Sequence, residues 1–162
     1  MSDFRVGIGV DAHALVEGVP LVIGGVRIDS PRGLEGHSDG DVIAHALIDA
    51  LLGAANLGDI GTLFPSGDER WRGADSLDLL RLAYERVVGT GWELVNADCV
   101  LVGEEPRIGP RRAEMSAALA GALGIAAERV AVRATTTDRL GFTGRGQGLA
   151  AQAVALLVRS TS

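Results

Sequence analysis

The C-terminal part of the chain contains a nearly uninterrupted apolar segment, Leu149-Ala150-Ala151-Gln152-Ala153-Val154-Ala155-Leu156-Leu157-Val158. Its pattern fits either a buried strand or a buried helix. We favour a strand, because the glycine-rich loop at 141–148 before it is typical of a hairpin with the strand predicted at 130–134. Such a strand is apolar on both sides and should be buried on both faces of its sheet.

The remaining elements place this strand in an α+β domain. We predict strands at 6–10, 92–102 and 130–134, and a hairpin at 21–28 around Gly24-Gly25. Apolar spacing predicts helices at 41–56, 76–88 and 114–123, with Ser38 as N-cap of the first helix, Gly58 at its end and Gly124 closing the third. The expected fold is one domain, 1–162, with a mixed four-stranded sheet, helices on one face and a small hairpin. A second subunit is the natural cover for the other face, so we expect a homo-oligomer.

Composition excludes several classes of protein. The formal net charge of −6 argues against a nucleic-acid binder. No segment has the roughly 20 apolar residues of a membrane span, and no signal peptide is evident. Cys99 is the only cysteine, so we expect a cytoplasmic protein without disulfides, in which Cys99 is a small core residue.

Two of the three histidines are candidate metal ligands. Asp11 and His13 are two residues apart on an extended segment, so their side chains leave the same face. His45 lies on the first predicted helix, where Asp41 and Asp49 share its face. Two imidazoles and a carboxylate are a plausible zinc set with one open position, and Asp49 could orient His45. Because an Asp-x-His pair is a weak motif, the spacing leaves this site undecided.

Two polar segments each allow two interpretations. The segment His37-Ser38-Asp39-Gly40-Asp41 could be a solvated turn before a capped helix, which the sequence alone slightly favours, or a phosphate site at the helix start. The segment Thr135-Thr136-Thr137-Asp138 could be ordinary strand residues. Its hydroxyls could instead hold phosphate oxygens, with Asp138 binding Mg²⁺.

Together these segments resemble the 2-C-methyl-D-erythritol 2,4-cyclodiphosphate synthase family, in the order and spacing of its motifs over about residues 5–158. The matching segments are Arg5–His13, His37–Asp41, Gly58–Gly61, Leu63–Pro65, Gly73–Ser76 and Ala134–Gly146. The resemblance implies a metal-dependent phosphorus–oxygen lyase of the non-mevalonate isoprenoid pathway. It would cyclise 4-diphosphocytidyl-2-C-methyl-D-erythritol 2-phosphate and release CMP. It also implies a homotrimer with active sites between subunits.

The resemblance assigns roles to individual residues. It implies that Asp11, His13 and His45 bind Zn²⁺, that Asp138 reaches Mg²⁺ or Mn²⁺, and that the catalytic residues His37 and Thr136 stabilise the transition state. The substrate region comprises Asp11, His13, His37, Ser38, Asp49, Asp59, Ile60, Gly61, Phe64, Pro65, Ser66, Gly67 and Asp68. The nucleotide region comprises Gly103, Glu104, Glu105, Pro106, Arg107, Ile108, Gly109, Ala134, Thr135, Thr136, Thr137 and Asp138. Phe142 and Arg145 match residues lining a cavity on the trimer axis, where an isoprenoid diphosphate is the implied ligand.

Several positions depart from the family pattern. Asp138 stands where Glu is usual and is one methylene shorter, which shortens its reach to a cation. Arg107 replaces a common Lys, which keeps the charge but changes the geometry. Ser66-Gly67 replaces a more acidic pair, and Gln147 replaces a common Glu near the axis.

The implied reaction needs no protein nucleophile, since the 2-phosphate of the substrate attacks the β-phosphorus. Two other functions are to be weighed against it. A metal-dependent phosphohydrolase would use a zinc-bound water and yield an open phosphate. A non-catalytic trimer that senses isoprenoid diphosphate through Phe142 and Arg145 would not need Asp11 or His13.

Overall fold

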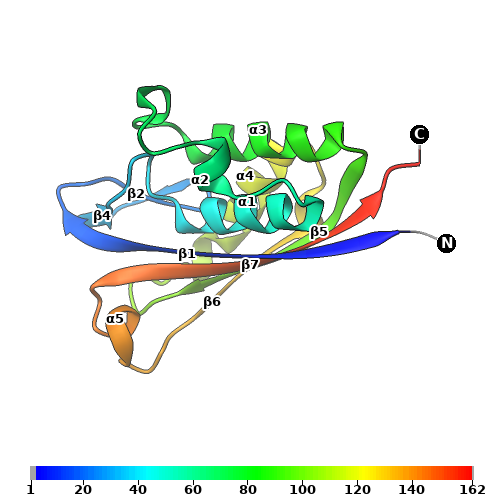
Figure 1. Ribbon diagram of the computed structural model, residues 1–162. Helices are drawn as coiled ribbons and strands as arrows, with labels where there is room; N and C mark the ends of the chain where they lie inside the picture. The colour runs from blue at the N-terminus through cyan, green and yellow to red at the C-terminus, as the bar shows by residue number, and fades with distance from the viewer. Residues whose placement is uncertain (1–2, 162) are drawn as a thin grey trace.

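The computed structural model describes residues 3–161, so the ends of the predicted domain 1–162 lie outside the described residues. The chain forms a twisted sheet with helices packed along one face (Figure 1). This is the predicted α+β architecture.

The main sheet contains five strands in the order β4-β1-β7-β5-β6, where four were expected. Its strands are β1 (Phe4–Glu17), β4 (Arg32–Leu34), β5 (Trp92–Val102), β6 (Val130–Thr135) and β7 (Gly148–Arg159). The prediction of four strands was wrong because β1 runs seven residues beyond Val10, to Glu17. This extension has a free edge, and the short strand β4 pairs with it, with Leu15 opposite Leu34. Three residues within a polar loop are too few to show an alternating pattern.

The apolar segment at 149–158 is the central strand of the sheet. β7 pairs antiparallel with β1 on one side and with β5 on the other. The predicted hairpin between β6 and β7 was therefore wrong: β6 pairs in parallel with β5 at the edge of the sheet. A strand that is apolar on both sides loses most water-exposed surface in the centre, whereas an edge position would leave part of it exposed.

Helices α1 (Val42–Ala55), α3 (Ser76–Gly89) and α4 (Arg112–Leu123) form the second layer, and all three were predicted. The separate hairpin of β2 (Leu21–Ile23) and β3 (Val26–Ile28) was also predicted. Short helices at Ile60–Leu63 (α2) and Gly141–Gly144 (α5) were not predicted, and three-residue 3₁₀ helices occupy Glu69–Trp71, Gly109–Arg111 and Ala127–Arg129. Within residues 3–161, the helices are too short or too polar to cross a bilayer.

The predicted range of α1, 41–56, agrees with the structure to within one residue at each end, but both capping residues were assigned wrongly. Asp41, not Ser38, is the N-cap, and its side chain accepts a hydrogen bond from the Ala44 amide. The C-cap is Asn56, which adopts a left-handed conformation, and not Gly58. Asparagine tolerates the left-handed conformation better than most residues, so Asn56 can end the helix before the chain reaches Gly58.

Helix α1 lies unusually close to β1. A β-carbon added at Gly9 would lie 1.8 Å from the Ala46 carbonyl oxygen, and one added at Gly7 would lie 1.9 Å from that of Ala50. Only glycine permits this approach. Residues of β1 that alternate with these glycines therefore point away from the helix.

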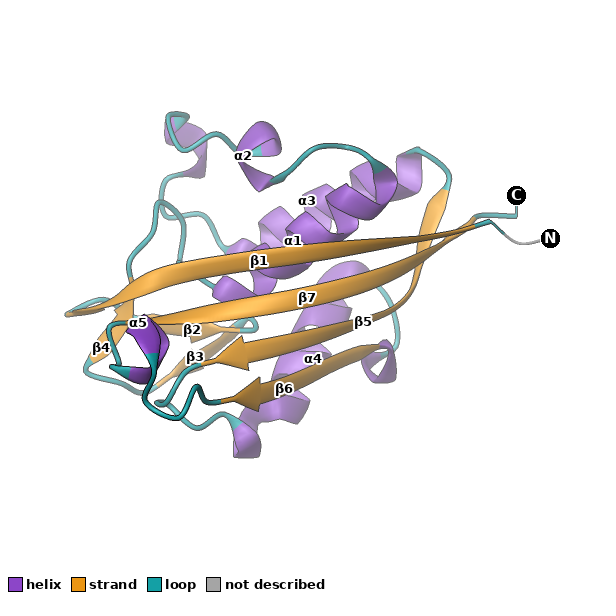
Figure 2. Cartoon of the chain, turned by 60° about the horizontal axis from the view of Figure 1, so that its bottom comes forward, coloured by secondary structure: helices purple, strands orange, loops and turns teal. Residues whose placement is uncertain are grey.

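The sheet face opposite the helices is uncovered and apolar. Figure 2 looks onto this face, with α1, α3 and α4 behind the strands. Four side chains of β1 and one of β7 are strongly exposed there, at 43–68%: Phe4, Val6, Ile8, Val10 and Val154. We call these five residues the open sheet face. Exposed apolar patches of this kind are typical of surfaces that contact another protein, a ligand or a membrane.

Candidate functional site

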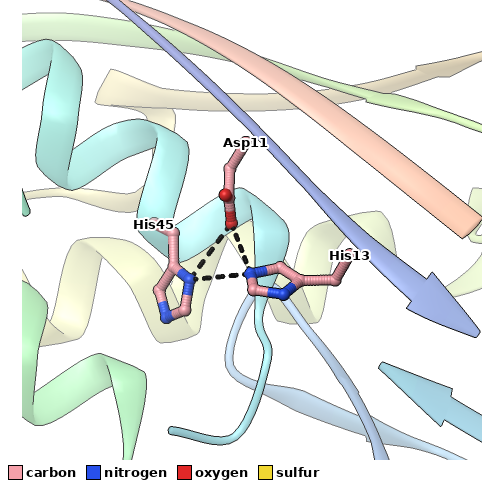
Figure 3. A group of neighbouring side chains, drawn as sticks. All are labelled: Asp11, His13 and His45. Carbon is pink, nitrogen blue, oxygen red and sulfur yellow. Dashed lines mark hydrogen bonds and ion pairs between the residues drawn. The ribbon is translucent and has the colours of Figure 1, made fainter. Parts of the chain in front are cut away.

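Asp11, His13 and His45 converge at one point between the sheet and α1 (Figure 3). Asp11 and His13 alternate with Ala12 on β1 and point toward the helix layer. His45 comes from the first turn of α1, which the glycines of β1 hold against the strand. The predicted ligand group is thus assembled where α1 packs closely against β1.

The spacing of the three ligand atoms suits zinc. Asp11 Oδ2 lies 2.8 Å from His13 Nε2 and 3.1 Å from His45 Nδ1, and the two nitrogens are 3.3 Å apart. Tetrahedral ligands about 2.0–2.1 Å from zinc lie about 3.3 Å from one another. The three ligand atoms are therefore spaced as three ligands of one metal ion would be.

Hydrogen bonding prepares His13 to bind a metal. Its Nδ1 lies 2.7 Å from the carbonyl oxygen of Glu35, which can only accept, so Nδ1 carries a proton and Nε2 is the nitrogen left for a metal ion. Without an ion, Nε2 of the protonated ring donates to Asp11, and this hydrogen bond raises the pKa of His13. Burial alone would raise the pKa of Asp11, but its hydrogen bonds to His13 and His45 outweigh burial and lower this pKa to about 2. Asp11 is therefore an ionised ligand at neutral pH.

The carboxylates expected beside His45 lie elsewhere. Asp49 accepts a hydrogen bond from the Ile60 amide at 2.7 Å, and Asp41 binds the amides of Gly24 and Gly25. Nε2 of His45 instead faces the hydroxyls of Ser76 at 2.8 Å and Ser38 at 3.0 Å. The expectation that Asp49 orients His45 was thus wrong, because the i+4 spacing does not account for the start of α2 as a competing partner.

The ligand group opens into a cavity of about 360 Å³. Most predicted substrate-region residues line it, and Trp71 and Leu79 were not anticipated: the full lining is Asp11, His13, His37, Ser38, His45, Ile60, Gly61, Phe64, Pro65, Ser66, Gly67, Trp71 and Leu79. Nε2 of His37 lies 3.3 Å from the Asp68 carbonyl oxygen, so this ring links the loop before α1 to the loop that contains Asp68. Trp71 packs edge-on against Phe64. The sequence signal for it was an aromatic residue in a segment, 61–73, that is otherwise rich in glycine, proline and charged residues.

Some predicted substrate residues support the cavity without lining it. Asp59 caps α2 through the Thr62 amide at 2.8 Å, and Asp68 pairs with Arg70 at 2.6 Å. Asp49 anchors the same helix through Ile60. These three carboxylates hold the loop that forms one wall.

The predicted nucleotide residues gather in a separate cavity of about 320 Å³, at the ends of β5 and β6. Its lining is Leu101, Gly103, Glu104, Pro106, Arg107, Ile108, Gly109, Arg112, Ala134, Thr135 and Thr136. Glu105, Thr137 and Asp138 do not line it. Asp138 is exposed with a positive φ of 51°, and Thr136 Oγ1 lies 3.4 Å from one of its oxygens.

Two strands separate the cavities. His13 pairs with Leu149 of β7, Ala150 pairs with Val102 of β5, and Val102 pairs with Thr135 of β6. Three strand spacings of about 4.8 Å place Thr135 about 14 Å from His13 across the sheet. The two cavities share no lining residue, so a single chain does not join the metal ligands to the threonines.

The two axial candidates lie on and beside α5. Phe142 is 44% exposed, and Nε of Arg145 is 3.4 Å from the Gln147 side-chain oxygen. Neither residue belongs to the two cavities.

Comparisons with known proteins agree with this arrangement. The model of the YgbB family matches residues 4–158. A relative from Rubrobacter xylanophilus named 2-C-methyl-D-erythritol 2,4-cyclodiphosphate synthase is 61% identical over 99% of this chain and 98% of its own. One of the same name from Moorella thermoacetica is 55% identical over 95% and 94%.

Solved structures give the same result. The bifunctional IspDF of Campylobacter jejuni superposes with a TM-score of 0.94 at 41% identity, over 98% of this chain, which spans 43% of that protein. A structure of 2C-methyl-D-erythritol-2,4-cyclodiphosphate synthase in its CDP-bound form gives a TM-score of 0.86 at 42% identity, over 94% of this chain and 99% of the other. The chain therefore belongs to the YgbB family, and the resemblance to 2-C-methyl-D-erythritol 2,4-cyclodiphosphate synthases predicted from its motifs is confirmed.

Proposed function

We propose that this chain is an enzyme that converts 4-diphosphocytidyl-2-C-methyl-D-erythritol 2-phosphate into 2-C-methyl-D-erythritol 2,4-cyclodiphosphate and releases CMP. The observation that carries the proposal is the Asp11–His13–His45 group at the mouth of a cavity lined by His37 and Ser38. This group occurs in a chain that is 61% identical, over nearly its whole length, to a relative named for that product.

Zinc is the ion that the three ligands fit by type and spacing, and it would neutralise and polarise a phosphate oxygen. The other side chains of the cavity would bind and orient the substrate. His37 would donate a hydrogen bond to the charge that develops on the attacked phosphate. Folding the substrate so that its 2-phosphate meets the β-phosphorus can lower the barrier by as much as about 7–11 kcal/mol through proximity.

The nucleotide end would occupy the second cavity. Thr136 would donate a hydrogen bond to the diphosphate, while Asp138 would hold a Mg²⁺ or Mn²⁺ ion with the substrate. The CDP-bound relative supports a cytidine nucleotide as the ligand of this region.

A homotrimer with shared active sites would join the two cavities. A diphosphate cannot span the roughly 14 Å that separates His13 from Thr135 in one chain. Packing the open sheet face against two further copies would bury Phe4, Val6, Ile8, Val10 and Val154 and bring one subunit's metal group to the next subunit's threonines. The axis of such a trimer would carry Phe142 and Arg145, which suit an isoprenoid diphosphate through an aromatic ring and a guanidinium.

Cys99 supports a reducing compartment such as the cytoplasm. It is fully buried, and burial raises the pKa of its thiol to about 12. The thiol is thus a core group with no disulfide partner in the chain.

Phosphorus NMR of the reaction with the cytidyl substrate tests the proposal. With Zn²⁺ and Mg²⁺ we expect resonances of CMP and of a cyclic diphosphate, and a chelator should abolish both. An open phosphate product would identify a metal-dependent phosphohydrolase instead. Ligand binding without any product would identify a non-catalytic binding protein.

A further inference from the structure

We infer that Ser76 and Asp39 are positioning residues for the metal ligand His45, joined to it by a carboxylate–hydroxyl–imidazole chain of hydrogen bonds. This inference rests on the proposed function and concerns two residues to which the sequence assigned no individual role. Ser76 opens α3, and Asp39 lies in the loop before α1.

The chain of contacts is continuous. Ser76 Oγ lies 2.8 Å from His45 Nε2, and the same hydroxyl forms a very short hydrogen bond to Asp39 Oδ1. The second oxygen of Asp39 accepts a hydrogen bond from the Ser76 backbone amide at 2.9 Å. Ser76 is fully buried, so water does not compete for its hydroxyl.

The directions of these bonds follow from what each group can donate. An ionised carboxylate only accepts, so the Ser76 hydroxyl proton is committed to Asp39. The hydroxyl oxygen can then only accept from His45, which fixes the imidazole proton on Nε2. Nδ1, which lies 3.1 Å from Asp11, is then the nitrogen that would bind a metal ion.

Asp39 is itself held by the backbone of the same loop. Its Oδ1 accepts a bond from the Asp41 amide at 3.1 Å, and its own amide donates to the Ala74 carbonyl oxygen at 3.2 Å. The carboxylate therefore ties the starts of α1 and α3 together behind the imidazole. It sets the ring orientation as well as the position of the proton.

This arrangement releases the hydroxyl proton of Ser38. Ser38 Oγ is 3.0 Å from His45 Nε2 and lines the cavity. Because Nε2 of His45 is a donor, the Ser38 hydroxyl does not donate to this nitrogen. The Ser38 oxygen accepts the Nε2 proton, or the Ser76 oxygen accepts it instead. The hydroxyl proton of Ser38 is free for an acceptor in the cavity, such as a phosphate oxygen.

The first test measures Zn²⁺ affinity by competition with a chelator, without substrate. Ser76→Ala keeps the backbone bond to Asp39 but removes the hydroxyl, and we expect it to weaken Zn²⁺ binding by about 10–100-fold. Asp75→Asn is the matched control, since Asp75 caps the same helix through the Leu77 amide and has no contact with His45. It should bind Zn²⁺ like the unmodified protein. Equal affinity in Ser76→Ala would overturn the inference.

The second test follows the Nε2 proton of His45 by long-range ¹H–¹⁵N NMR in protein saturated with Zn²⁺, where the metal ion occupies Nδ1. In the unmodified chain we expect a proton on Nε2 that the Ser76 oxygen accepts and that exchanges slowly with water. In Asp39→Asn the new amide can donate to Ser76, so the serine hydroxyl no longer has to accept from Nε2, and the Nε2 proton should exchange faster. Equal exchange rates in the two proteins would contradict the inference.

The two proposals fail separately. Suppose that the protein releases CMP, but substitution of Ser76 and Asp39 changes neither its Zn²⁺ affinity nor the imidazole proton of His45. The proposed function then stands and the inference is refuted. A protein that releases no CMP yet shows both effects keeps the inference and loses the proposed reaction.

Discussion

The two ring nitrogens of His45 have separate partners, so substitution of this residue tests the metal site. Nδ1 faces Asp11 and Nε2 faces the two serines. We expect His45→Ala to lose Zn²⁺ binding by more than about 100-fold, since even partners outside the coordination sphere contribute about 10–100-fold. CMP release should fall with it, as measured by metal content and product formation on the same sample.

His37→Ala is the matched control for that prediction. His37 lines the same cavity but is not one of the three ligands, so this variant should retain Zn²⁺ while CMP release falls by about 100-fold. Full CMP release from zinc-free His45→Ala protein would refute the assignment of the metal site.

Sequence reasoning found the ligands but not their support. Asp11, His13 and His45 could be named because the motifs around them resemble a known family. Ser76 and Trp71 lie on segments that approach the site only in the folded chain. The spacing of residues along the sequence does not indicate which distant segments will meet. Asp49 was misjudged for the same reason, because the amide it binds is contributed by another element.

At the scale of elements, the contact between β1 and α1 positions the metal ligands. Gly9→Ala would place a methyl group 1.8 Å from the Ala46 carbonyl oxygen, so helix and strand must separate. We expect a loss of about 3 kcal/mol in unfolding free energy by urea denaturation, together with weaker Zn²⁺ binding.

Gly53→Ala provides the comparison within α1. An added β-carbon there meets only the Ile8 carbonyl oxygen, at 4.0 Å, so this variant should be neutral or more stable by up to about 1 kcal/mol. Similar stability of both variants would show that the close approach does not constrain the fold.

The N-cap of α1 predicts a pH dependence. Burial raises the pKa of Asp41 to about 6 from its ordinary value of 3.8, so the folded state binds this proton more tightly than the unfolded state. Its contribution to stability is therefore greatest below pH 3.8 and declines as pH rises to about 6. The shift corresponds to about 3 kcal/mol.

Asp41→Asn removes this titration. Between pH 4 and pH 7 the unfolding free energy of the unmodified protein should fall, relative to the variant, by an amount approaching that value. Urea denaturation at several pH values measures the difference. A difference that is independent of pH would contradict the raised pKa.

At the scale of the whole molecule, the open sheet face is the surface through which the proposed trimer would form. Ile8 is 65% exposed at its centre, and an arginine there would place a charge where the proposed trimer has none. We expect Ile8→Arg to sediment as a single 16.7 kDa chain, whereas the unmodified protein has three times that mass, and to lose CMP release.

Val88→Arg is the control for this prediction. Val88 is an exposed apolar residue of similar size on α3, away from the open sheet face. It should leave mass and activity unchanged. A monomeric unmodified protein that releases CMP would contradict the shared active site.

The overall layers were predictable because they follow from periodicity. The α1, α3 and α4 patterns, β5 and the 21–28 hairpin all emerged from local spacing. Strand order did not, because pairing partners are chosen over the whole chain. The position of β7 between β1 and β5 follows from which strand gains most by burial on both sides, a comparison that no single segment contains.

The central position of β7 also dictates an order of events during synthesis. β1 is made first, but its long partner β7 leaves the ribosome after every other strand. Until then β1 and β5 each have an unpaired edge, and such edges invite pairing with other chains. Long-range pairing of this kind slows folding. A nascent chain would thus carry Asp11, His13 and His45 well before it possesses the sheet that fixes two of them in place.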